Sequence, residues 1–365
     1  MSAGTWVLGV DSGGSGLRIA LGTPTPTPGS GPEAGAPPGP GAGADAGSDH
    51  GTAARGRGTG GVRVVESAAF AEPVRTGAGG IDAQHLLERL VPAAEGLLER
   101  AGAGPLAAVA IGAAGMATLG DDLRAVLPRA LRRSLGVTSL ALAADAVTAY
   151  AGALGQRPGA VVAAGTGLIA LGTDLSGWRR ADGWGHLLGD CGSGAWIGRA
   201  GLEAALRAHD GRHGGSAPLL ARVRAVFGPP AALPGLLYPR PDRPAVLASF
   251  APEVARCATE GDPVAAGILA GAARHVAEAA AAVCPGGQDR EVALTGGLFR
   301  MGDPLLVPVR AELAEHVPHA RVVPAAGDPL DGALAVAAAL AEDELRLPRE
   351  PGMLETTTLR PTTRT

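Results

Sequence analysis

The chain of 365 residues contains no lysine and no asparagine, so all 31 of its basic residues are arginine. A P-loop of the Walker type needs a lysine at the β- and γ-phosphates. Protein-kinase chemistry needs a strand lysine and a metal-binding asparagine, and Schiff-base catalysis by lysine is excluded as well. Any nucleotide chemistry in this chain must therefore use another phosphate-binding design.

Cysteine is scarce too. Cys191, Cys257 and Cys284 are widely spaced and odd in number, which fits neither a disulfide framework nor a zinc pattern. No apolar run reaches the roughly 18 residues of a membrane span, and Asp11 interrupts the first apolar run, so no secretory signal is predicted. A net charge of −4 gives no reason to expect nucleic acid or a membrane as a partner. We expect a soluble, cytoplasmic protein.

Two segments have a composition typical of disordered regions. Residues 22–61 contain 13 glycines and 7 prolines but no aliphatic residue larger than alanine and no aromatic residue. Such a segment cannot offset its ordering entropy, so we predict a disordered insertion at the tip of a hairpin. Residues 346–365, rich in Thr, Pro and Arg, are predicted to form a disordered tail.

Elsewhere apolar runs alternate with helical patterns. Strands are predicted at 6–10, 17–21, 62–67, 107–112, 140–144, 160–164, 169–173 and 291–295, and helices at 82–101, 121–135, 146–154 and 331–343. Two strands bracket a glycine turn twice, around residues 13–16 and 165–167. This repetition predicts a duplicated α/β fold with an N-terminal domain (1–155), a C-terminal domain (156–345) and a cleft between them. The last helix could return to the N-terminal domain.

The two glycine turns are candidate phosphate sites. Tight glycines let backbone N–H groups point at one anion, and Asp11, at the end of the first strand, could hold Mg²⁺ or its water shell. A plain hairpin turn is the alternative interpretation of either turn alone. Two such turns, opening two similar halves, could grip one polyphosphate from opposite sides.

Two further features suggest chemistry. Asp145 ends an apolar strand and starts a helix, where it could cap the helix or accept a proton from a substrate hydroxyl. Residues 181–194 hold five glycines among which Trp184 could stack on a sugar ring and Asp190 could accept two sugar hydroxyls. An irregular loop with a packed tryptophan is the alternative.

Residues 183–190 (GWGHLLGD) carry a family resemblance. They resemble the N-acetylglucosamine kinases, in the BadF/BadG/BcrA/BcrD branch of the actin-like and sugar-kinase superfamily. Residues 294–299 resemble the adenosine motif of that family, residues 328–333 its closing segment, and residues 261–263 a further pattern before a helix. The similarity covers residues 6–21 and 62–345.

The resemblance implies two duplicated actin-like (ribonuclease H-like) domains, with ATP and Mg²⁺ as cofactors. Asp145 would be the catalytic base, and Asp11 would meet Mg²⁺, directly or through water. The implied ATP and phosphate residues are Asp11, Gly13, Gly14, Ser15, Thr166, Gly167, Gly296 and Gly297. The implied substrate residues are Asp145, Gly165, Gly183, Trp184, Gly185 and Asp190.

The chain departs from the family pattern at three places. Residues 74–80 lack the family's sugar-contacting asparagine, Leu168 replaces a serine after the second phosphate motif, and Cys191 replaces a glutamate. We therefore expect an ATP-dependent kinase of an amino sugar or hexose, with N-acetylglucosamine 6-phosphate as the leading product and a homodimer as an open alternative. The rival interpretations are an activator ATPase of a 2-hydroxyacyl-CoA dehydratase or benzoyl-CoA reductase system, and a non-catalytic sugar sensor.

Overall fold

The computed structural model describes residues 5–14, 16–25, 58–59, 61–77, 80–116 and 120–359. The strands are β1 (Trp6–Gly13), β2 (Gly16–Pro24), β3 (Gly58–Thr59), β4 (Val62–Phe70), β5 (Thr76–Gly77), β6 (Gly80–Ile81), β7 (Leu106–Ala113), β8 (Ser139–Ala144), β9 (Gly159–Ala164), β10 (Leu168–Thr173), β11 (Trp178–Asp182), β12 (Arg290–Thr295), β13 (Ala320–Pro324) and β14 (Leu354–Thr358). The α-helices are α1 (Ala83–Ala101), α3 (Asp121–Leu135), α4 (Asp145–Leu154), α5 (Gly194–His209), α6 (Ala217–Phe227), α7 (Leu233–Leu237), α8 (Arg243–Ala248), α9 (Ala251–Thr259), α10 (Pro263–Val283), α11 (Asp303–His316) and α12 (Pro329–Ala341), with 3₁₀-helices η1 (Pro230–Ala232) and η2 (Gly297–Met301).

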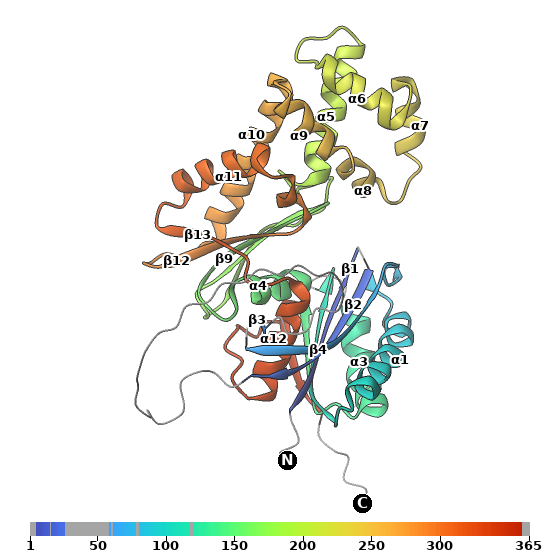
Figure 1. The fold of residues 1–365 in the computed structure, drawn as a ribbon, viewed down its shortest axis with the longest axis vertical. Coiled ribbons are helices and arrows are strands. Elements are labelled where there is room, and N and C mark those ends of the chain that lie inside the picture. The colour runs from blue at the N-terminus through green and yellow to red at the C-terminus, as the bar shows by residue number, and fades with distance from the viewer. Residues whose placement is uncertain are drawn as a thin grey trace, which may run out of the picture.

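Two sheets form the centres of two lobes (Figure 1). The N-terminal lobe holds a seven-stranded sheet in the order β14-β8-β7-β1-β2-β4-β3, and the C-terminal lobe holds a five-stranded sheet in the order β11-β10-β9-β12-β13. β5 and β6 form a separate two-stranded ribbon. Each sheet has its own cluster of buried hydrophobic residues.

The two sheets repeat one topology. β1 pairs antiparallel with β2 and parallel with β7, which pairs parallel with β8. In the second lobe β9 pairs antiparallel with β10 and parallel with β12, which pairs parallel with β13. β4 and β11 occupy the same place beyond β2 and β10. The duplicated α/β fold predicted from the two glycine turns is therefore confirmed.

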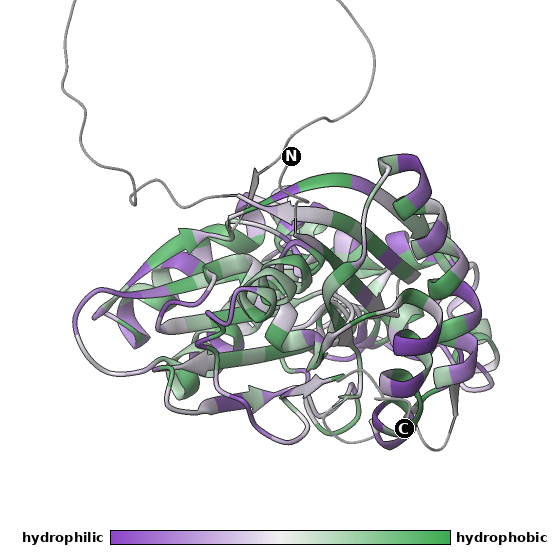
Figure 2. Cartoon of the chain, turned by 90° about the horizontal axis from the view of Figure 1, so that it is seen from below, coloured by the Kyte–Doolittle hydropathy of each residue, from purple (hydrophilic) through white to green (hydrophobic). Residues whose placement is uncertain are grey.

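Periodic apolar residues explain the helices that cover the first sheet. In α3 four leucines spaced four residues apart are buried, and the helix ends at Gly136, whose φ of 65° suits glycine. In α1 the carboxylate of Asp82 caps the first turn by accepting the N–H of His85 at 3.0 Å. Hydrophilic residues gather on the outward turns of the helices (Figure 2). No helix in the described part of the chain has both the length and the apolar character to cross a membrane.

The helices that end the two repeats cross each other between the sheets. α4 contacts β9, β10 and β12 of the second lobe, whereas α12 packs against β1 and β7 of the first. Their crossing depends on a glycine in each helix. A Cβ atom on Gly152 would lie 2.0 Å from the carbonyl oxygen of Asp328, and one on Gly332 would lie 1.9 Å from that of Thr148. The backbones approach so closely that no larger residue fits.

We expect Gly332→Ala to destabilise the protein by about 2–3 kcal/mol, because the added methyl must push the two helices apart. The matched control is Gly267→Ala in α10, where an added Cβ meets nothing within 4 Å and should stabilise the helix by roughly 0.5–1 kcal/mol. Urea unfolding followed by circular dichroism measures both variants. Equal shifts in the two variants would contradict a tight crossing.

The predicted disordered tail is wrong for most of its length. β14 pairs antiparallel with β8 at the edge of the first sheet, and Leu347, Leu354 and Leu359 are buried there. The indole Nε1 of Trp178 also donates to the carbonyl of Pro348 at 2.8 Å. Three leucines and a strand of β-branched threonines cover an otherwise open sheet edge. The overall composition of the tail hid this capacity to form a strand.

The predicted insertion is too long at both ends. β2 continues to Pro24, which pairs with Val62, and β3 pairs with β4. The N–H of Thr25 donates to the carbonyl of Gly61 at 2.7 Å. Backbone hydrogen bonds need no hydrophobic side chain, so glycine and threonine prolong this hairpin without contributing to a core. Residues 26–57 and 60 lie outside the described residues.

Candidate active site

The candidate residues gather at the carboxyl ends of parallel strands. β1, β7 and β8 are mutually parallel, so the first glycine turn and Asp145 follow strands that end at the same edge of their sheet. In the second lobe the second glycine turn follows β9 and Gly296 follows β12, a parallel neighbour of β9. Ligands of open α/β sheets bind at this edge.

At the first turn, Asp11 forms an ion pair with a residue that the sequence analysis did not single out. Arg18, its cross-strand partner on β2, donates to Oδ2 of Asp11 from Nε at 3.0 Å and from Nη2 at 2.6 Å. Nη1 of Arg18 donates to Oδ2 of Asp328 at 2.5 Å. Burial raises the pKa of Asp11, and the hydrogen bond and charge of Arg18 oppose this shift. Only tertiary structure could reveal a contact across 310 positions.

The remaining residues of the first turn are less constrained. A Cβ on Gly13 or Gly14 would meet nothing within 4 Å, so open space adjoins the Cα atoms of both residues. Gly16 has a φ of 130°, and a Cβ there would lie 2.1 Å from the carbonyl oxygen of Phe70, which explains why the hairpin closes on glycine. Ser15 lies outside the described residues.

Asp145 is the first residue of α4 rather than its cap, which is Ala144. Its Oδ1 accepts one hydrogen bond, from the N–H of Ala146 at 2.8 Å, so the capping interpretation is wrong. Burial raises the pKa of Asp145 to about 6; the negative charge of Asp11 adds to this shift, and the positive charge of Arg180, on the other lobe, opposes it. Asp145 is thus a half-buried, weakly paired carboxylate within electrostatic reach of both lobes.

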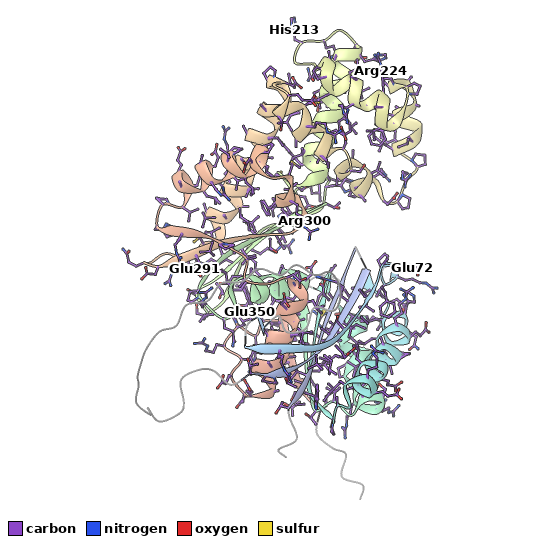
Figure 3. All side chains as sticks on the ribbon, viewed as in Figure 1. Glu72, His213, Arg224, Glu291, Arg300 and Glu350 are labelled. Carbon is purple, nitrogen blue, oxygen red and sulfur yellow. The ribbon has the colours of Figure 1, made fainter. Side chains whose placement is uncertain are left out.

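The second glycine turn packs against a helix start and the adenosine motif. The N–H of Gly194 donates to the carbonyl of Gly165 at 2.9 Å, and the N–H of Ala195 donates to that of Thr166 at 3.0 Å. A Cβ on Gly296, whose φ is 106°, would lie 2.1 Å from the carbonyl oxygen of Ala164. Gly297 begins η2, and Arg300 in the same helix points toward the N-terminal lobe (Figure 3). The structure therefore brings these three motifs together.

The loop after β11 is held by Asp182, which the sequence analysis did not single out. The Asp182 carboxylate accepts the N–H groups of Asp190 at 2.5 Å and Cys191 at 2.8 Å. Asp190 in turn accepts the N–H of Gly185 at 3.0 Å, and a Cβ on Gly167 would lie 2.6 Å from Asp190 Oδ2. Burial raises the pKa of Asp190, and the Gly185 N–H opposes the shift. Asp190 thus lies between the candidate sugar loop and the second glycine turn.

Trp184 stands out from this loop with 65% of its surface exposed. The Arg180 guanidinium lies 4.5 Å from the centre of the indole ring, and it donates to the carbonyls of Asp182 at 3.0 Å and Gly183 at 2.6 Å. Arg180 forms no ion pair with a carboxylate in the described part of the chain. An aromatic face beside an unpaired cation can take a sugar ring and an anionic substituent.

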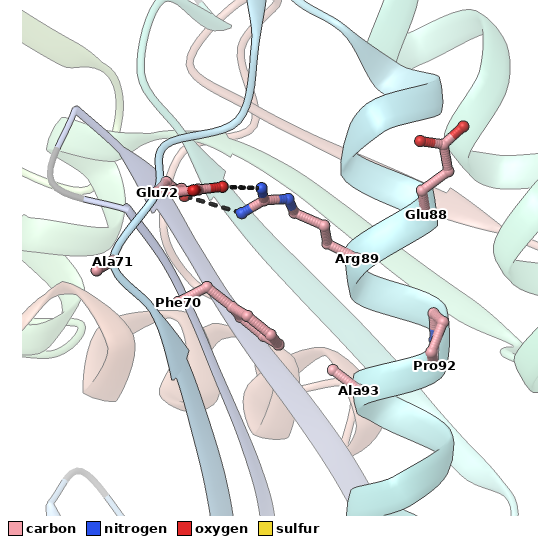
Figure 4. A pocket seen from close by; sticks show the side chains of 7 residues that line it. All are labelled: Phe70, Ala71, Glu72, Glu88, Arg89, Pro92 and Ala93. Atoms are coloured by element: carbon pink, nitrogen blue, oxygen red, sulfur yellow. Dashed lines mark hydrogen bonds and ion pairs between the residues drawn. The ribbon is translucent and has the colours of Figure 1, made fainter.

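An open groove of about 610 Å³ lies elsewhere, between the end of β4 and α1 (Figure 4). Its walls are Phe70, Ala71, Glu72, Glu88, Arg89, Pro92 and Ala93. Arg89 Nη2 and Glu72 form an ion pair of 2.5 Å across one end. None of the candidate site residues lines this groove, and we assign it no part in the chemistry.

Residues 8–332 match the model of one protein family. The chain belongs to the BadF/BadG/BcrA/BcrD ATPase family. The family resemblance drawn from residues 183–190 is thereby confirmed, as is the two-domain actin-like fold. The family's name implies the binding of ATP, for which the two glycine turns are the candidate sites.

Among individual relatives, an N-acetylmuramic acid/N-acetylglucosamine kinase of Clostridium acetobutylicum is 43% identical over 82 residues, which are 22% of this chain and 27% of that protein. The match thus spans about a quarter of that relative. A provisionally assigned N-acetylglucosamine kinase of Chromobacterium violaceum superposes with a TM-score of 0.64 at 26% identity, covering 91% of this chain and 98% of the other. Another, of Porphyromonas gingivalis, shares the fold at 15% identity with a TM-score of 0.56, covering 90% and 96%.

Proposed function

We propose that this member of the BadF/BadG/BcrA/BcrD ATPase family is an ATP-dependent amino-sugar kinase, with N-acetylglucosamine as acceptor and its 6-hydroxyl as the phosphorylated atom. The observation that carries the proposal is Asp145. Its half-buried, weakly paired carboxylate lies at the carboxyl edge of the first sheet, with Asp11 and Arg180 close enough to influence its pKa. The names of the relatives support the sugar class.

In the proposed reaction, the acceptor hydroxyl attacks the γ-phosphorus of ATP. A bond forms between the sugar oxygen and phosphorus, the bond from phosphorus to the β,γ-bridging oxygen breaks, and the hydroxyl proton passes to Asp145. A pKa of about 6 keeps this carboxylate ionised at pH 7.5 while making it a stronger base than an exposed aspartate. Backbone amides of the two glycine turns would stabilise the charge that spreads over the phosphates.

Magnesium would enter with the nucleotide. Asp11 fits that role because Arg18 engages only its Oδ2, so that Oδ1 accepts no hydrogen bond from the described residues. No group of three or more potential ligands could hold a metal ion in the part of the chain that the structure describes. One carboxylate, with water and phosphate oxygens, is the usual set for nucleotide-bound Mg²⁺, which neutralises phosphate charge.

A second acceptor is favoured by one observation. Arg180 stacks on Trp184 and pairs with no described carboxylate, so it could bind the carboxylate of an acidic amino sugar such as N-acetylmuramic acid, which the name of one relative includes. We propose N-acetylmuramic acid as the second candidate acceptor. Residues 74–80 offer no amide side chain, so selectivity for the acetamido group should be loose.

A coupled ADP-release assay tests both acceptors. The panel contains N-acetylglucosamine, N-acetylmuramic acid, glucosamine and glucose, with phosphorus NMR of each product to locate the phosphate. We expect sugar-dependent ADP release with at least one amino sugar. ATP hydrolysis that no sugar accelerates would contradict the kinase and favour the activator ATPase.

The rival functions have less support. An iron–sulfur activator needs accessible thiolates, yet Cys257 and Cys284 are buried in the hydrophobic cluster of the second lobe, and only Cys191 is partly exposed. A visible absorption spectrum of the isolated protein tests this rival. A sensor without turnover would have no use for the half-buried carboxylate of Asp145, which lies within electrostatic reach of Asp11 on the first hairpin.

We expect kcat/KM to fall about tenfold per pH unit below pH 6, because protonated Asp145 cannot accept the hydroxyl proton and its pKa is about 6. The folded pKa lies above the ordinary value of 3.8, so protonation of Asp145 stabilises the folded state, and this stability is lost as the pH rises through 6. Titration of Asp145 therefore lowers activity at pH 5.5 without unfolding the protein. A profile that stays flat to pH 5 would contradict Asp145 as the base.

A further inference from the structure

Beside the first glycine turn lies a cation, Arg18, that the proposed reaction does not use. Arg18 is 36% exposed at its side chain and makes three hydrogen bonds, two to Asp11 and one to Asp328. A guanidinium has five N–H donors in a fixed plane. One N–H on Nη1 and one on Nη2 therefore remain without a partner among the described residues.

The surroundings of Arg18 are acidic. Asp11 and Asp328 both contact it, and Asp331 lies in the first turn of α12, where its Oδ2 accepts the N–H of Asp328 at 2.9 Å. Asp145 lies within electrostatic reach of Asp11. A polyphosphate would be repelled by these carboxylates unless a cation stood among them. Because the chain has no lysine, that cation must be an arginine, a protonated histidine or the metal, and Arg18 is the cation that contacts these carboxylates.

Two carboxylates, those of Asp11 and Asp328, hold the guanidinium of Arg18 in a fixed position. Oδ1 of Asp328 accepts the N–H groups of Leu330 at 2.8 Å and Asp331 at 3.1 Å, which caps α12, while Oδ2 of Asp328 holds Arg18. Arg18 thus joins the β1–β2 hairpin to the start of the helix that crosses α4. The remaining N–H groups of Nη1 and Nη2 therefore have a fixed direction, which the flexible side chain of a free arginine would not give them.

We propose that Arg18 is a phosphate-binding residue: held between Asp11 and Asp328, it donates its two remaining N–H groups to the terminal phosphate of the nucleotide. It takes the place that a lysine holds in other phosphate loops. The inference rests on the proposed use of ATP. Because nucleotide binding can be measured without sugar, metal or turnover, its test is separate from that of the kinase reaction.

The test is titration of a fluorescent ATP analogue and its ADP counterpart in EDTA. Arg18→Met should weaken binding of the ATP analogue about ten- to a hundredfold, the range for charge-assisted hydrogen bonds, and that of the ADP analogue less. Arg18→Lys should recover part of the loss. The control is Arg89→Met, which removes a similar ion pair with Glu72 outside the site and should bind like wild type.

A double variant separates direct contact from charge balance. In Asp11→Asn/Arg18→Met the net charge of the pair is unchanged, so binding should stay at least fivefold weaker than wild type if Arg18 contacts phosphate. Recovery of wild-type affinity would overturn the proposal, as would wild-type binding by Arg18→Met. Thermal melting of each variant identifies unfolded protein. Failure of the wild-type protein to bind either analogue in EDTA and also with Mg²⁺ present would instead contradict the proposed function itself.

Discussion

Replacing Asp145 should abolish most of the turnover while leaving both substrates bound. We expect kcat to fall about 10²- to 10⁴-fold in Asp145→Ala, the usual effect of removing a general base. ATP and sugar dissociation constants should stay within a few-fold, because among the described residues the carboxylate accepts a single hydrogen bond, from the N–H of Ala146, and its removal disturbs little else. Ala144 remains as the cap of α4, so the helix keeps its first turn.

Asp145→Asn is the matched variant, since it keeps the shape and removes the charge. It should be as inactive as Asp145→Ala and at least as stable as wild type near neutral pH, because burial disfavours the ionised carboxylate. Steady-state kinetics gives kcat, calorimetric titration gives the two dissociation constants, and melting gives stability. Turnover of the asparagine variant within a few-fold of wild type would leave Asp145 with a structural role only.

Asp190→Ala should raise the KM for the sugar about ten- to more than a hundredfold, since each hydrogen bond to a charged acceptor contributes about 1.5–3 kcal/mol. The ATP KM should change much less. The loop keeps its frame in this variant, because the Asp182 carboxylate still accepts the N–H groups of residues 190 and 191. A deoxy sugar that lacks the contacted hydroxyl should lose no further affinity in the variant.

Asp182→Asn is the control for loop disorder. If Asp190 only fixes the loop through the Gly185 N–H, both variants should show the same kinetics with every sugar. The Oδ2 atom of Asp190 lies next to Gly167 of the second glycine turn. If Asp190 supports that turn rather than binding the sugar, Asp190→Ala should raise the KM for ATP more than the KM for the sugar. Either pattern would contradict Asp190 as a sugar ligand.

Much of the site was predictable because its motifs are local. The glycines of both turns, the strand-end position of Asp145 and residues 183–190 lie in short stretches whose pattern can be recognised from sequence. The role of Arg18 could not be recognised from sequence, because one arginine within a predicted strand forms no distinctive local pattern. Asp182 was missed because its role depends on the loop conformation. Its carboxylate accepts backbone N–H groups of residues eight and nine positions further on, and backbone N–H groups carry no sequence signal.

The sequence by itself determined the repeat of strand, glycine turn and strand, the positions of α1, α3, α4 and α12, and the family, because periodicity and turn chemistry act over a few neighbouring residues. Tertiary structure alone decided which strands pair and which helix covers which sheet. The tail became β14 because β8 had an open edge, and α4 can cross α12 and contact both sheets because Gly152 and Gly332 let the two helix backbones touch. Contacts between residues hundreds of positions apart depend on the packed shape of the whole chain, which no local pattern records.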